Sequence, residues 1–191
     1  MNWARAFIVG AGSASLMMAF IDIFNMMGVT PFSFEKYLGT LITENQYAVH
    51  SFTIGVLVNW ILGGIFGLFY AYFFEYVFKA ANARLGTIVG FSHAILAAIA
   101  FFPFFGIIHE FLNTGLYRDF GFFGSSLGGP TPILLLFSHL IFGTMMGTFY
   151  GPVQRDRVRA RHTEPGYLIF PGVQDPQAIS SADDHEDRAA I

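Results

Sequence analysis

The stretch SFTIGVLVNWILGGIFGLFYAYFF, residues 51–74, determines the expected fold class because it contains no charged side chain. About 20 apolar residues suffice for a helix to cross about 30 Å of hydrocarbon. Similar runs cover about residues 6–29, 86–108 and 132–150. They are continuously apolar and do not alternate, so they predict helices rather than barrel strands. We therefore expect an all-α, polytopic membrane protein with a bundle of four transmembrane helices.

The composition agrees with a lipid environment. Hydrophobic residues make up 54% of the chain and charged residues 12%, about half of the usual globular share of about 25%. The absence of cysteine excludes disulfides, thiol catalysis and thiolate-held metal clusters. No complete catalytic set of residues is recognised, so we predict a non-enzymatic protein.

Two matches at an offset of 80 residues suggest a duplicated helical hairpin. IVG at 8–10 meets IVG at 88–90, and ILGGIFGLFY at 61–70 meets IFGTMMGTFY at 141–150. Each repeat contains an even number of spans, so both copies enter the membrane in the same direction as parallel repeats. We predict a first hairpin at 1–80, a second hairpin at 81–153 and a polar tail at 154–191.

Lys and Arg residues predict the orientation. They gather on the side of the spans that holds the N-terminus, the 75–85 loop and the tail, with only Lys36 and Arg118 on the other side. The positive-inside rule then places both termini in the cytoplasm of a bacterial inner membrane. Several aromatic residues near these ends are expected at the lipid–water interface: Trp3, Tyr70, Tyr72, Tyr76 and Tyr150.

Glycines spaced by four residues are expected to serve in helix packing. Gly63 and Gly67 share one helix face, as do Gly143 and Gly147. Small residues let two backbones approach closely and gain dispersion contacts. We favour packing within the bundle over a seam between copies, because these glycines occur in both halves.

The outer connections carry local signals. Thr30-Pro31 resembles a helix cap, and residues 32–42 are expected to form a short interfacial helix against lipid. Gly128-Gly129-Pro130 predicts a turn before the last span.

Polar residues within the apolar runs are the candidate site. Asp22, Asn59 and His139 have similar estimated depths in the outer part of the membrane, so they could meet in one layer. Two interpretations remain open: a proton, metal or solute site that opens outward, and a hydrogen-bond network that only joins helices.

Other titratable residues are possible secondary ligands: His93, His50, His109 and Glu110. His93 and His139 could bracket a haem between facing helices, but their estimated depths differ by several ångströms, which argues against it. Without HxxxH or HExxH spacing the metal signal is weak. We therefore predict no cofactor.

The tail after Pro152 begins with alternating basic residues suited to anionic lipid headgroups, and its remainder has few means of forming a core. Such a tail is expected to order only against another chain. The basic run is short and flanked by acidic residues, so nucleic-acid binding is not expected.

Several short patterns together resemble those of a family of small, uncharacterised prokaryotic membrane proteins with four spans. They are the N-terminal Arg5–Gly10 segment, Met26-Met27-Gly28 with Pro31 and Leu38-Gly39, Gly63 and Gly67, and the SHLIFG run at 138–143. The likeness covers about residues 4–151. It implies a four-span fold and no established activity.

We expect a membrane subunit that packs, amid lipid, against other membrane-protein subunits of a larger inner-membrane assembly, such as an electron-transfer complex. The alternative is a small transporter or channel in which Asp22, Asn59 and His139 line an outward cavity. A haem- or metal-binding membrane protein is the third hypothesis.

Overall fold

The computed structural model describes residues 1–43, 49–109 and 120–153, and every element in these ranges is helical. Four helices are long and apolar enough to cross a membrane. The chain is therefore a multi-pass membrane protein with four long apolar helices packed together, as the sequence predicts. The expectations about the tail and about Glu110 concern residues outside the described ranges.

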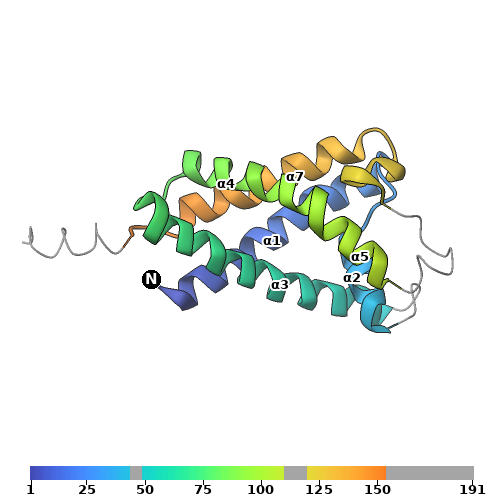
Figure 1. Ribbon diagram of the computed structural model, residues 1–191. Coiled ribbons are helices and arrows are strands. Elements are labelled where there is room, and N and C mark those ends of the chain that lie inside the picture. Colours follow the sequence, from blue (N-terminus) through green and yellow to red (C-terminus); the bar gives the residue numbers. More distant parts are fainter. Residues whose placement is uncertain (44–48, 110–119, 154–191) are drawn as a thin grey trace, which may run out of the picture. The chain divides into compact units, whose positions relative to one another are not determined.

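The first and second spans are α1 (Trp3–Met26) and α3 (Val49–Tyr72), and α3 continues into a π-helical segment, η1 (Phe73–Phe78). The third runs through α4 (Ala83–Leu96), π-helical η2 (Ala97–Phe101) and α5 (Phe102–Ile108), and the fourth is α7 (Thr131–Phe149). In Figure 1, α1 and α4 start at the end that holds the N-terminus, and α3 and α7 run back towards it.

Matching asparagines begin the first and third spans. Asn2 Oδ1 accepts a hydrogen bond from the Arg5 backbone N–H at 3.1 Å, and Asn82 Oδ1 accepts one from the Leu85 N–H at 3.0 Å. Both are N-caps, which satisfy a backbone donor that the helix leaves unpaired. The two residues are 80 positions apart, the offset of the sequence match.

Glycines allow two pairs of spans to pack backbone against backbone. A Cβ on Gly10 of α1 would lie 2.8 Å from the Cα of Gly67 on α3. A Cβ on Gly86 of α4 would lie 2.9 Å from the Cα of Gly147 on α7. Both distances are shorter than side chains tolerate, so only glycine fits these crossings.

The two pairs differ in register by one helical turn. The carbonyl oxygen next to Gly10 belongs to Gly63, whereas the one next to Gly90 belongs to His139 rather than Gly143. Gly143 instead packs on Gly86, in the place that Gly67 occupies on Ala6. Position 86 of α4 corresponds to position 6 of α1 at the offset of 80 residues. Because position 86 is glycine rather than alanine, the backbone of α7 can approach α4 one turn nearer to the N-terminus of α4. The contacts of α4 with α7 therefore do not repeat those of α1 with α3 at an offset of 80 residues.

Contacts between α1 and α7 join the pairs, whereas the described parts of α3 and α4 make no comparable contact. Near the N-terminus, Arg5 Nε and Nη2 donate to the Phe149 carbonyl at 3.2 and 3.0 Å. The Tyr150 hydroxyl donates to Glu75 Oε1 at 2.7 Å. Tyr150 and Tyr70 are buried in the core here, so the expected interfacial position is wrong for both.

The short helix α2 (Phe34–Thr43) lies against the first turns of α3 at the opposite end of the bundle. It does not use Phe32, Tyr37 and Leu38 against lipid, as the sequence suggested: all three are buried with Ile21, Phe120 and Leu134. Thr30 does not cap α2. Its hydroxyl lies 2.9 Å from that of Thr131 and accepts from the Phe32 N–H.

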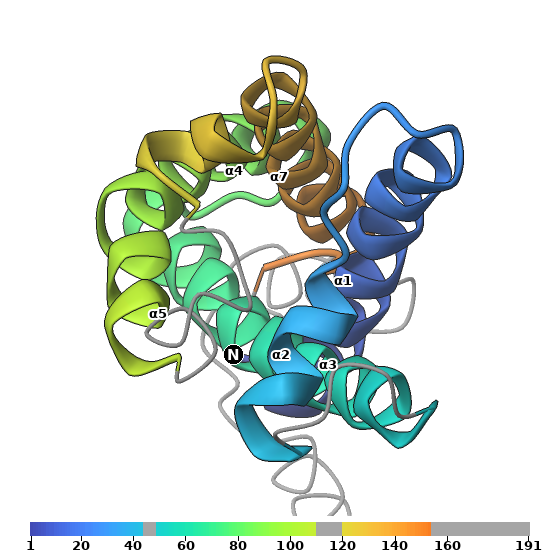
Figure 2. The same ribbon diagram turned by 90° about the vertical axis from the view of Figure 1, so that its right-hand side faces the viewer.

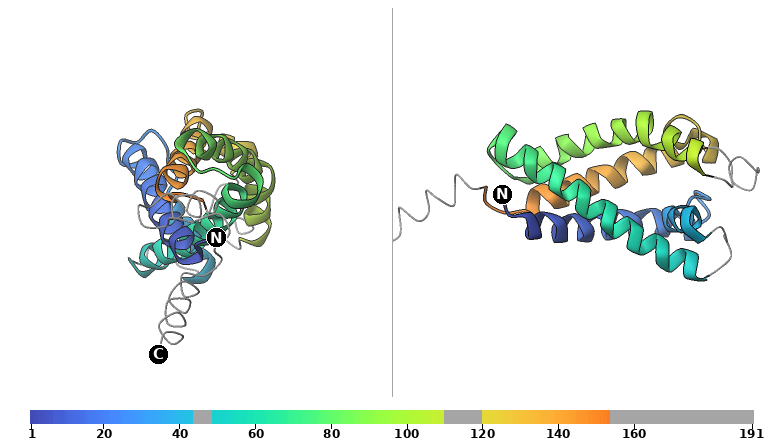
Figure 3. Two further views of the ribbon diagram at one scale, coloured as in Figure 1. Left: turned by 90° about the vertical axis from the view of Figure 1, so that its left-hand side faces the viewer. Right: turned by 60° about the horizontal axis from the view of Figure 1, so that its bottom comes forward.

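A 3-10 segment, η3 (Phe122–Leu127), and the turn at Gly128–Pro130 precede α7. Gly128 has φ +120°, a conformation that side chains disfavour, so the predicted turn is confirmed with a physical reason for its glycine. The end view in Figure 2 shows α1, α7 and α4 in that order around the bundle, with α3 beside α1. Figure 3 shows the same arrangement from the N-terminal end.

Candidate functional site

A pair of acidic side chains lies at the α2 end of the bundle. The carboxyl groups of Asp22 on α1 and Glu35 on α2 are close enough to influence each other's protonation. Glu35 is completely buried, and its Oε2 accepts from Ser33 Oγ at 3.0 Å. Its Oε1 has no hydrogen-bond donor among the described residues. A proton shared between the two carboxyl groups would remove the repulsion between their charges.

The environment of Glu35 favours its protonated form. Burial, and then the hydrogen bond and charge of Asp22, raise the pKa of Glu35 from 4.5 to about 7. The backbone of α2 lies directly against that of α3: a Cβ on Gly55 of α3 would collide with the Glu35 carbonyl, and one on Gly39 would collide with that of Ser51. The two glycines thus allow α2 and α3 to pack closely at Glu35, whose side chain is buried.

Asp22, Asn59 and His139 do not form one layer around an outward cavity. Asn59 Nδ2 donates to the sulfur of Met18 at 3.1 Å, and Asn59 and His139 line the same internal cavity. Asp22 lies one turn beyond Met18 on α1 and does not line that cavity. The structure thus joins two of the three residues and pairs the third with Glu35, which the sequence reasoning missed.

Histidines from two spans meet beside this cavity. The rings of His93 on α4 and His139 on α7 lie edge to face with centroids 4.9 Å apart. His139 is 5% exposed, and its Nδ1 lies 2.7 Å from the Leu135 carbonyl oxygen. A carbonyl only accepts, so Nδ1 carries the hydrogen and Nε2 is an acceptor in the neutral ring.

Tyr70 of α3 reaches His93 across the open side of the bundle. Its hydroxyl lies 3.3 Å from His93 Nδ1 and is buried. The described residues offer this hydroxyl no other hydrogen-bond acceptor, so it donates to Nδ1 and the hydrogen of the His93 ring lies on Nε2. The expected secondary ligand His93 is therefore placed by a residue that the sequence analysis had assigned to the membrane interface.

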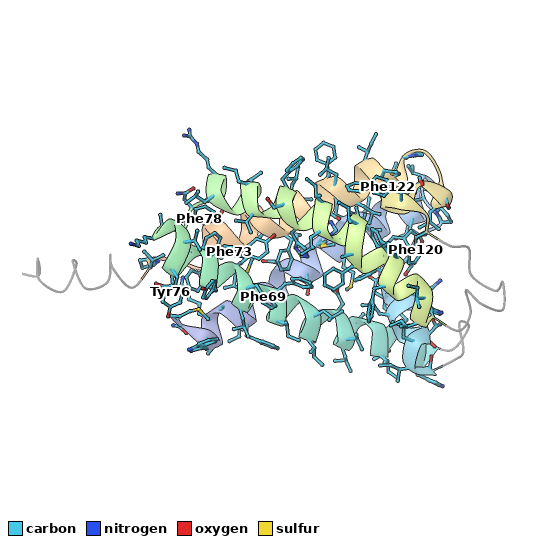
Figure 4. The ribbon with its side chains drawn as sticks, in the orientation of Figure 1. Phe69, Phe73, Tyr76, Phe78, Phe120 and Phe122 are labelled. Carbon is cyan, nitrogen blue, oxygen red and sulfur yellow. The ribbon has the colours of Figure 1, made fainter. Side chains whose placement is uncertain are left out.

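Two cavities meet at His93. The inner one has a volume of about 70 Å³ and includes Asn59, His93 and His139 in its wall. The outer one is a groove of about 390 Å³ between α3 with η1 and α4 with η2, and it includes Phe69, Phe73, Phe78 and Ile88. Both are lined by Phe66, His93 and Phe101. Figure 4 shows Phe69, Phe73, Tyr76 and Phe78 gathered on α3 and η1, nearer the N-terminal end.

The other candidate ligands do not join this site. His109 is buried at the α2 end, where Nε2 lies 3.0 Å from Thr40 Oγ1 and 3.3 Å from the Tyr37 carbonyl. Burial lowers the pKa of His109, so a neutral ring stacked on Tyr37 fits a packing role. His50 is exposed near the start of α3.

The two contacting histidines leave no room for a planar haem between them, since their rings touch edge to face. The described residues also hold no group of three or more His, Cys, Asp or Glu side chains placed to bind a metal ion. The arrangement instead provides neutral hydrogen-bonding groups in an apolar cavity.

The sequence Gly124-Ser125-Ser126-Leu127-Gly128 fits the Gly-x-Ser-x-Gly pattern of hydrolases. That pattern carries catalysis when the serine lies on a turn between a strand and a helix. Here the first four residues of the pattern lie in the 3-10 segment η3 and the last directly follows it, and the described chain contains no strand. The local structure therefore does not provide a nucleophile elbow.

Comparison with protein-family models, with curated proteins and with solved structures finds no significant match. The comparisons identify no family, so the resemblance to small prokaryotic four-span proteins stays a prediction.

Proposed function

We propose that the protein is a non-enzymatic membrane subunit that packs against a larger bacterial inner-membrane assembly, such as an electron-transfer complex. In this proposal two parallel hairpins arose by duplication, and both termini face the cytoplasm. Arg5, Lys79 and Arg84 at one end support this orientation. The equivalent caps Asn2 and Asn82 support the duplication.

The open side of the bundle is the observation that supports a partner. The helix pairs are joined through α1 and α7, while α3 and α4 border a groove of about 390 Å³. Phe69 on its rim is 58% exposed and Phe73 is 40% exposed. Aromatic side chains dominate the energetics of many protein interfaces. A transmembrane helix of another subunit, laid over this rim, would bury them and close the bundle.

Purification in mild detergent followed by native mass spectrometry tests the proposal. We expect the chain with other membrane subunits, and loss of these subunits when Phe69→Ala and Phe73→Ala are combined. Phe137→Ala on α7 is the matched control, because Phe137 is also exposed but does not line the groove. Recovery of a lone monomer from gently treated membranes would reject the subunit role.

The alternative is a small transporter or channel. The Asp22–Glu35 pair supports this function better than the combination of Asp22, Asn59 and His139 that the sequence suggested. Paired carboxyl groups that share a proton can exchange it for a cation. Proteoliposomes with a pH-sensitive dye inside test this function. A transporter would show proton flux that Glu35→Gln abolishes and Lys36→Gln, on the exposed side of α2, leaves unchanged.

A haem- or metal-binding role remains the third proposal, and the contact between His93 and His139 does not favour it. An optical spectrum of the purified protein tests it, because a haem would give an intense Soret band.

A further inference from the structure

We propose that the groove between α3 and α4 binds a bilayer-dissolved quinol or quinone, with the ring at His93 and His139 and the apolar chain along the groove. This chain alone builds the site, and the ligand would occupy the groove that the partner helix proposed above would cover, so the two are alternative occupants that binding to the isolated chain distinguishes.

The size and continuity of the cavities fit such a molecule. Ligand pockets commonly measure about 300–1,000 Å³, and the outer groove alone measures about 390 Å³. The inner cavity of about 70 Å³ continues past His93. This inner cavity provides room for a polar substituent of the ligand's ring, while the apolar chain lies in the outer groove. A ligand could enter sideways from the hydrocarbon, since α3 and α4 border the groove and do not pack backbone against backbone.

Aromatic rings at the junction suit a flat ring. Phe66 and Phe101 pack edge to face with centroids 5.3 Å apart, and Phe66 lies 4.3 Å from the His93 ring. Aromatic pairs in offset or edge-to-face contact gain stability beyond the area that they bury. A quinol ring at this junction would add another member to the cluster.

The hydrogen-bonding groups provide one donor and one acceptor. Tyr70 holds the His93 tautomer in which Nε2 carries the hydrogen, and the Leu135 carbonyl holds the His139 tautomer in which Nε2 accepts. No hydrogen bond joins the two rings among the bonds of the described chain. A quinol oxygen can accept from His93, and its hydroxyl can donate to His139. A quinone can use only the first of these bonds, so we expect it to bind more weakly.

The charge of the site argues against phospholipids and fatty acids. Neither cavity has Lys or Arg in its wall. Phosphate and carboxylate heads would therefore lose their hydration without gaining a cation. A neutral head that makes a few directed hydrogen bonds avoids this cost.

Calorimetric titration of the full chain in detergent tests the inference with a matched ligand series. The series comprises a decyl-substituted benzoquinol, its quinone, its dimethyl ether and decylbenzene. We expect the quinol to bind at least tenfold more tightly than the ether and decylbenzene, with the quinone between them. Equal affinities for all four ligands would mean that the groove binds any apolar chain without recognising the ring hydroxyls. This result would overturn the proposal, and it requires no substituted protein.

Substitutions then assign the contacts. His139→Leu should remove the preference for quinol over its ether, and His139→Gln should restore part of it, because an amide oxygen also accepts. His50→Leu, at an exposed site outside both cavities, is the control and should leave the preference intact. A full preference in both His139→Leu and His93→Leu would overturn the proposed contacts.

Discussion

Tyr70 on α3 and His93 on α4 are joined by a hydrogen bond of 3.3 Å between two spans that otherwise meet through the Phe66 ring rather than backbone against backbone. This bond crosses the floor of the lateral groove and fixes the tautomer of an imidazole that also lines the inner cavity. The bond thus links residues from both walls of the groove.

Tyr70→Phe should destabilise the protein modestly. It removes the hydroxyl and keeps the ring, so the loss should be that of a buried hydrogen bond, about 1 kcal/mol. Unfolding in detergent, followed by circular dichroism, measures the change. Tyr72→Phe is the control because Tyr72 is exposed on the same helix. Equal effects of the two substitutions would contradict the structural role of the Tyr70–His93 bond.

Gly10→Ala should be strongly destabilising and Gly12→Ala should not. A Cβ at position 10 would meet the backbone of α3, whereas one at position 12 has no neighbour within 4 Å. Forced separation of the helices should cost about 1–3 kcal/mol. In an exposed helix, alanine gains up to about 1 kcal/mol over glycine. The same unfolding assay compares both variants, and equal stabilities would mean that α1 and α3 do not cross at Gly10.

The stability of the folded protein should decrease as the pH rises from about 4.5 to about 7. Folding raises the pKa of Glu35 over this interval, so the folded state binds more protons than the unfolded state. The shift corresponds to at most about 3 kcal/mol, which is present in full at low pH and is lost above pH 7. Glu35→Gln should flatten this pH dependence, and Lys36→Gln should retain it. An unchanged pH profile in Glu35→Gln would show that another group is responsible.

Labelling of single cysteines tests the proposed orientation, because the natural chain has no cysteine. Lys36→Cys lies on α2 and Lys79→Cys directly follows η1, at opposite ends of the bundle. We expect an impermeant maleimide to label position 36 from the periplasmic side and position 79 only after the inner membrane is opened. The reverse pattern would invert the topology.

The sequence was sufficient to predict the four spans because each is a long apolar run, and the observed helices start and end within a few residues of the expected positions. Depth along a helix can also be estimated from residue counts. Rotation about the helix axis and the register between helices depend on packing, which residue counts do not contain. Asp22 was therefore placed level with Asn59, although Met18, one turn earlier, is the residue that contacts Asn59.

Glu35 was missed because it lies in a short segment outside the long apolar runs. A local signal was present: Glu35, Leu38 and Gly39 follow the i, i+3, i+4 spacing of one helix face, and all three are buried. A carboxylate on an otherwise apolar face could have marked it as a buried acid. Tyr70 carried no comparable signal, because its role depends on α4 lying opposite.

Spin-label accessibility at position 73 tests most directly the central claim that the groove opens sideways into hydrocarbon. Phe73→Cys adds one thiol to a cysteine-free chain on the rim of the groove. For the labelled protein in liposomes, we expect stronger relaxation by oxygen, which concentrates in hydrocarbon, than by a water-soluble nickel chelate. Stronger relaxation by the nickel chelate would place the groove in water and contradict the account.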